Sequence, residues 1–140
     1  MKIARSFPAE VESIPAARRF VAGMLVDVPT DLSDAIAVMV SELAMNAVQY
    51  AGTQFGVRAE VSAGSLRVEV TDAGGGLPEL QPFPPASSPR GRGLLIVHLL
   101  SDDWGVIPSP TGTGKSVWFQ IALTVRPDSP VHLMPGRADR

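Results

Sequence analysis

The chain has 140 residues, of which 45% are hydrophobic and 19% charged, a balance that fits one globular domain with a sizeable core. The net charge is −2 and the basic residues are scattered, which excludes the basic stripe of a nucleic-acid-binding protein, and without cysteine there is no disulfide framework or thiolate zinc site. No run of residues approaches the roughly 18 apolar positions of a membrane span, and the N-terminal segment lacks the apolar run of a signal peptide, so we expect a cytoplasmic protein.

The first part of the chain predicts a strand followed by two helices. Residues 3–8 predict a short edge strand, and apolar positions at helical spacing predict a helix over 10–28. Pro29 breaks the chain, and Thr30 is the expected N-cap of a second helix that keeps the 3.6-residue period to about Tyr50.

A hairpin is expected after the second helix. Residues 54–61 and 66–71 alternate apolar and polar side chains, which predicts two strands that share one buried face. The turn between them falls at 62–65, and Asp72 stands where the second strand stops.

The last part of the chain begins with a loop and ends with a tail. Residues 73–91 are rich in glycine and proline and predict a long loop that can act as a lid. A short apolar helix is expected over 92–100, and strands are expected over 104–107 and 116–123. Residues 126–140 contain three prolines and no period, so we expect a flexible C-terminal tail.

Glu42 and Asn46 are four residues apart, which places them on one face of the predicted helix, at the edge of its apolar stripe. A carboxylate there can take a proton, and an amide oxygen one turn further can hold a hard cation such as Mg²⁺. The same spacing is common on solvated helix faces, so the pair alone leaves both interpretations open.

Two glycine-rich segments follow. Asp72-Ala-Gly74-Gly-Gly76 places a carboxylate and flexible backbone at a strand end, where an exocyclic amine such as that of adenine can bind; the alternative is an ordinary Asp-Gly turn. Gly91-Arg92-Gly93 opens an apolar helix, whose free N–H groups can bind phosphate; the alternative is a loop-to-helix transition.

The segment Gly112-Thr-Gly114-Lys115-Ser116 is not a P-loop. The P-loop requires a glycine five residues before Gly114, where this chain has Ser109, and it opens a helix, whereas a strand follows here. We expect a tight turn beside the site.

In this order the segments resemble the nucleotide-binding boxes of the GHKL ATPases, the superfamily of gyrase, histidine kinases and MutL. The matching segments are Glu42-x-x-x-Asn46, Asp72-x-Gly74-x-Gly76, Gly91-x-Gly93 and Gly114-Lys-Ser-Val-Trp-Phe. Within the superfamily the chain looks most like the small stand-alone anti-sigma factor serine/threonine kinases of actinobacteria. The superfamily commonly has a threonine next to the adenine-binding aspartate. This chain has Lys115 at that place, and the actinobacterial proteins that it resembles also have a lysine there.

The resemblance implies a Bergerat fold over residues 1–125. This is an α/β fold, more closely an α+β two-layer sandwich, in which a mixed, mostly antiparallel sheet is covered on one face by helices. The implied ligands are ATP and Mg²⁺, with Asn46 coordinating Mg²⁺, Glu42 acting as general base on a serine or threonine, and Asp72 reading the adenine amino group. The other implied nucleotide-binding residues are Gly74, Gly76, Arg90, Gly91, Arg92, Gly93, Leu94 and Gly114.

The resemblance also implies a role in transcription regulation. We expect a protein serine/threonine kinase that phosphorylates a STAS-type anti-sigma antagonist and binds a sigma factor, without contacting nucleic acid or membrane; a homodimer is left open. The sequence contains no helical region with a phospho-acceptor histidine ahead of the domain, which argues against a sensor histidine kinase. The alternatives are a non-catalytic partner-binding module, with ATP as a structural ligand or without it, and an ATP hydrolase with no protein acceptor.

Overall fold

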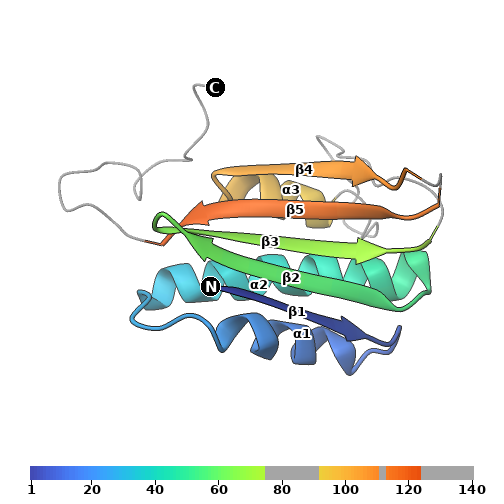
Figure 1. Ribbon diagram of the computed structural model, residues 1–140, viewed down its shortest axis with the longest axis horizontal. Coiled ribbons are helices and arrows are strands. Elements are labelled where there is room, and N and C mark those ends of the chain that lie inside the picture. The colour runs from blue at the N-terminus through green and yellow to red at the C-terminus, as the bar shows by residue number, and fades with distance from the viewer. Residues whose placement is uncertain (75–91, 111–112, 124–140) are drawn as a thin grey trace.

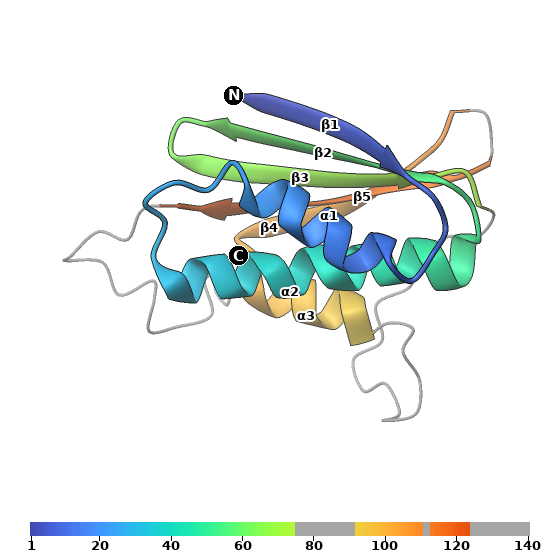
Figure 2. The same ribbon diagram turned by 90° about the horizontal axis from the view of Figure 1, so that it is seen from below.

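The computed structural model describes residues 1–74, 92–110 and 113–123, which form a sheet and a layer of helices packed on one of its faces (Figures 1 and 2). The elements in chain order are β1 (Lys2–Phe7), α1 (Ser13–Ala22), α2 (Thr30–Asn46), the π-helical turn η1 (Ala47–Ala51), β2 (Phe55–Ser62), β3 (Ser65–Asp72), α3 (Arg92–Leu100), β4 (Asp103–Pro108) and β5 (Lys115–Ala122). In these segments no helix combines the length and the apolarity needed to cross a membrane.

The five described strands form one sheet in the order β1-β2-β3-β5-β4, and all four pairings are antiparallel. The predicted hairpin is confirmed as β2–β3. Its two-residue turn consists of Ala63 and Gly64, whose φ values of 53° and 78° suit the tight turns that match the twist of paired strands. The expected α/β fold, a mostly antiparallel sheet with helices on one face, is therefore confirmed.

Two helix boundaries differ from the expectation. The first helix is shorter than 10–28, because the chain after Ala22 continues in turns in which Met24 and Leu25 donate to carbonyls only three residues back. Thr30 is not the N-cap of α2. Pro29 holds that position with an extended ψ of 145°, and its carbonyl accepts the first helical hydrogen bond, from the Ser33 N–H at 3.0 Å.

The core lies between the sheet and the helices. Alternate strand residues point toward α2, which lies between α1 and α3 (Figure 1). Burying each large side chain of this kind contributes about 1.5–3 kcal/mol. The largest side chains that are fully buried are Phe55, Phe119, Ile36, Met39, Leu43, Leu66 and Leu94.

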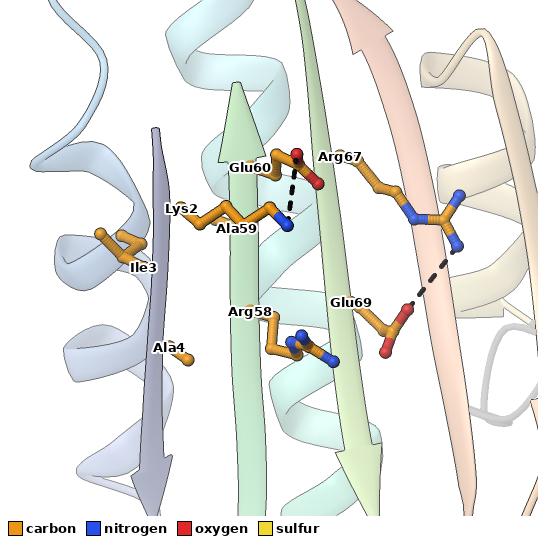
Figure 3. A pocket seen from close by; sticks show the side chains of 8 residues that line it. All are labelled: Lys2, Ile3, Ala4, Arg58, Ala59, Glu60, Arg67 and Glu69. Atoms are coloured by element: carbon orange, nitrogen blue, oxygen red, sulfur yellow. Dashed lines mark ion pairs between the residues drawn. The ribbon is translucent and has the colours of Figure 1, made fainter. Parts of the chain in front are cut away.

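No described helix covers the other face of the sheet, and this face is polar. A pocket of about 290 Å³ lies there over β1–β3, lined in part by Lys2, Arg58 and Glu60 (Figure 3). Arg67 also lines this pocket, and its guanidinium lies 4.1 Å from the ring centroid of Trp118. The indole of Trp118 in turn lies across Gly105, the residue opposite it on β4.

We predict that Gly105→Ala disturbs this outer face. An added Cβ would lie 2.8 Å from Trp118 Nε1, so the indole would have to leave its place beneath Arg67. Overpacking of this kind lowers the free energy of unfolding by about 1–3 kcal/mol, which a urea unfolding curve would measure. Gly56→Ala is the matched control, because Gly56 is also a strand glycine with no atom within 4 Å of its added Cβ. Equal losses for both variants would contradict the proposed role of Gly105.

Candidate functional site

Glu42 and Asn46 lie one turn apart on α2, both half-buried, and the first turn of α3 packs directly against them. A Cβ built on Gly93 would lie 3.1 Å from Glu42 Oε2 and 3.5 Å from Asn46 Nδ2. The structure thus brings together three residues that the sequence singled out, although they lie on two helices separated by the whole β2–β3 hairpin. A glycine at position 93 lets the two helices approach this closely.

The helix changes its hydrogen-bonding pattern immediately after Asn46. Residues Ala47–Ala51 form a π-helical turn that ends where the Gly52 N–H donates to the Ala47 carbonyl at 3.0 Å, five residues back. Gly52 has a φ of 66°, which a residue with a side chain rarely adopts, so the helical segment ends at Gly52, close to the expected end near Tyr50. Single π-helical turns inside helices are frequent at functional sites.

Asp72 lies at the end of β3 and points to the helix side of the sheet, where both of its oxygens are engaged. Oδ2 accepts from Lys115 Nζ at 2.9 Å, and Oδ1 accepts from the Gly74 N–H at 2.9 Å. The ion pair is buried, with the Lys115 and Asp72 side chains only 8% and 5% exposed. The turn through Gly74, which the sequence offered as the ordinary alternative, is therefore present, together with a buried charge pair.

The glycines beside Asp72 hold segments of backbone in contact. A Cβ on Gly74 would lie 2.5 Å from Ala51 Cα, at the end of the π-helical turn. Gly114 has a φ of 84°, and a Cβ there would collide with the Asp72 carbonyl oxygen. These two glycines join η1, the end of β3 and the start of β5 into one wall of the site, beside the tight turn expected near Gly114.

The remaining predicted nucleotide-binding residues are only partly described. Gly76, Arg90 and Gly91 lie outside the described residues, as does the expected tail at 126–140. Arg92 begins α3. Leu94 is 1% exposed and packs in the core, so it can contribute only its backbone amide to a phosphate site.

Lys115 is the residue of the site to which the sequence assigned no role. Its signal was the alternation of β5, in which Val117, Phe119 and Ile121 face the core and place Lys115 on the same side. A charged residue at an inward position of a strand requires a partner. That partner is Asp72, which lies directly opposite Lys115 in the β3–β5 register.

The side chains at this site suit a cation that is bound mainly by phosphate oxygens, rather than a metal ion that is held by protein ligands alone. Among the described residues, no cluster of three or more histidine, cysteine, aspartate or glutamate side chains could hold a metal. Mg²⁺ typically keeps several waters and takes one or two protein oxygens together with substrate phosphates. The amide of Asn46, close to the first turn of α3, fits that mode.

Comparison with known proteins agrees with the geometry. Residues 7–121 match the model of a family described as the histidine kinase-like ATPase domain. Comparison with curated protein sequences gives no significant match.

Two solved structures share the fold. One contains the RsbU and RsbW domains of Rv1364c from Mycobacterium tuberculosis, with a TM-score of 0.70 and 16% identity over 90% of this chain and 33% of that chain. The other is the EL346 blue-light activated histidine kinase of Erythrobacter litoralis, with a TM-score of 0.55 and 28% identity over 84% of this chain and 42% of that chain. The chain therefore spans about a third of the first structure and less than half of the second.

We predict that Asp72→Asn destabilises the fold, because it leaves the Lys115 ammonium buried without a charged partner. Breaking a buried ion pair from one side costs about 3–5 kcal/mol, whereas breaking an exposed pair costs about 0–1 kcal/mol. Glu60→Gln, which removes the exposed pair with Lys2, is the matched control. Urea unfolding curves would measure both variants, and an Asp72→Asn loss no larger than that of Glu60→Gln would show that the buried pair contributes little.

Proposed function

Because the chain belongs to the histidine kinase-like ATPase domain family, within the GHKL superfamily, we propose that it is an ATP-binding anti-sigma-type regulator that acts as a protein serine/threonine kinase. As parts of the same proposal, the ATPase domain extends over residues 1–125 and the protein is cytoplasmic. The observation that carries it is the packing of the first turn of α3 on Glu42 and Asn46.

The geometry supports a division of roles. The first N–H groups of α3 have no partner within their own helix and can bind phosphate oxygens. Asn46, beside Gly93, is then close enough to the phosphates to hold Mg²⁺, which would neutralise the charge that develops during transfer. Asp72, on the wall formed with Gly74 and Gly114, accepts from the amino group of the base.

Glu42 is the proposed general base. Its carboxylate takes the proton of a serine or threonine hydroxyl, the hydroxyl oxygen forms a bond to the γ-phosphorus, and the bond from that phosphorus to the leaving ADP oxygen breaks. Phosphoryl transfer depends mainly on positioning and charge neutralisation, so a small set of residues can suffice. The half-buried Glu42 carboxylate, next to the helix proposed to bind the phosphates, supports this role.

The proposed protein substrate is a STAS-type anti-sigma antagonist, and a sigma factor is the proposed second partner. The sequence resemblance to anti-sigma factor kinases supports both partners. The shared fold with a structure that includes an RsbW domain agrees with this proposal.

A second candidate function is a binding module that controls a partner without phosphoryl transfer. One observation favours it: Lys115 already satisfies the Asp72 carboxylate, so this part of the site is stable without a nucleotide. In that case ATP is a structural ligand or is not used.

We predict that Glu42→Gln lowers phosphoryl transfer from radiolabelled ATP to the STAS-type protein by about 10²–10⁴-fold, the usual contribution of a general base. ATP binding, measured by calorimetry, should change little, because Glu42 is assigned no contact with the nucleotide. Asp34→Asn is the matched control, since Asp34 is an exposed carboxylate on the same helix. Transfer that survives Glu42→Gln would exclude Glu42 as the base, and ATP binding by the unaltered protein without any transfer would favour the binding module.

A further inference from the structure

The Lys115 ammonium has hydrogen-bonding capacity that the described residues do not use. An ammonium carries three N–H donors, and the structure gives Lys115 Nζ one acceptor, Asp72 Oδ2. The lysine is 7% exposed. Buried donors are nearly always paired, and leaving them unpaired is costly, so the two remaining donors are available to an acceptor on a bound ligand.

The backbone fixes where that acceptor must lie. Lys115 and Asp72 are paired residues of β5 and β3, so their side chains leave the sheet side by side. Because Gly114 has no side chain, the start of β5 can lie directly against the Asp72 carbonyl. The site therefore presents a fixed pair of groups, a carboxylate oxygen that accepts and an ammonium that donates, 2.9 Å apart.

This pair is complementary to a base edge on which a donor and an acceptor are neighbours. Adenine has such an edge, because its exocyclic amine donates and the adjacent ring nitrogen N1 accepts. Bases with an N1–H and a carbonyl in those places, as in inosine and guanine, would present a donor to the ammonium and an acceptor to the carboxylate. Proteins read bases by hydrogen bonds of this kind to the Watson–Crick edge.

We propose that Lys115 is a specificity-determining residue of the nucleotide site and donates to the ring nitrogen N1 of adenine, beside the amine that Asp72 accepts. The inference rests on the proposed function, because it requires that ATP binds with its base at Asp72. Without nucleotide, the ammonium donates one hydrogen bond to the carboxylate across the β3–β5 pair. A lysine can only donate at this position, so Lys115 rejects bases that carry a hydrogen on N1.

The test compares ATP with 1-deaza-ATP, in which N1 is replaced by C–H, by calorimetry on the unaltered protein. We expect the analogue to bind about tenfold or more weakly, because a hydrogen bond from a charged donor is lost. The control ligand is 7-deaza-ATP, altered on another edge of the base, which should bind like ATP. Equal binding of ATP and 1-deaza-ATP would overturn the inference and leave the proposed function standing. If the unaltered protein binds no ATP, both are overturned.

Variants show whether the discrimination belongs to Lys115. Lys115→Met should bind ATP about tenfold more weakly and lose the preference for ATP over 1-deaza-ATP, whereas Lys2→Met, at the other lysine, should keep both. Because Lys115→Met leaves Asp72 buried and unpaired, the neutral double variant Asp72→Asn/Lys115→Met is measured alongside it and should show the same loss of preference. Tighter ATP binding by Lys115→Met would mean that the ammonium only blocks the site, and a preserved preference would assign it to another residue; either result overturns the inference.

Discussion

The pairing of β3 with β5 is the constraint on which the site depends. It sets Asp72 against Lys115, 43 residues away along the chain. Helix α3 lies within the intervening segment, so closing this pair also constrains where α3 can pack, and its first turn meets Glu42 and Asn46 on α2. The loop-closure entropy of joining distant strands is large but grows slowly with length, and the core side chains of both strands offset it.

A buried ion pair is an expensive way to join two strands. Removing two charges from water costs several kcal/mol for each ion, and a well-packed apolar pair of similar volume is often as stable or more so. Stability alone therefore gives no reason for Asp72 and Lys115 at the edge of an otherwise apolar wall. The proposed nucleotide, whose base would need both an acceptor and a donor there, would give such a reason.

Local patterns in the sequence predicted much of the fold and part of the site. The alternation around Ala63 and Gly64 was enough for the hairpin, and four-residue spacing was enough to put Glu42 and Asn46 on one helix face. The predicted N-cap of α2 was wrong, because the Pro29 carbonyl accepts the first helical hydrogen bond and no side chain caps the helix. The extended ψ of Pro29 is a backbone property that the preference of threonine for N-cap positions does not reveal.

Features that depend on distant partners could not be predicted. The Lys115–Asp72 pair follows from the register of two strands that are not neighbours in the chain, whereas the sequence placed Lys115 in a turn just before the predicted strand. The packing of Gly93 on Glu42 required the position of α3, which no local pattern specifies. The apolar period of α2 also continues past Asn46, which hides the change to π-helical bonding.

That change has a geometric consequence for the whole site. A π-helical turn is equivalent to one residue inserted into an α-helix, and each residue turns the helix by about 100°. Without the extra residue, Ala51 would be rotated away from its contact with Gly74, whereas Glu42 and Asn46, which precede the turn, would stay in place. The π-helical hydrogen bond thus sets the rotation between the helix face that carries Glu42 and Asn46 and the wall formed by η1, β3 and β5. This rotation does not depend on which side chains line the site.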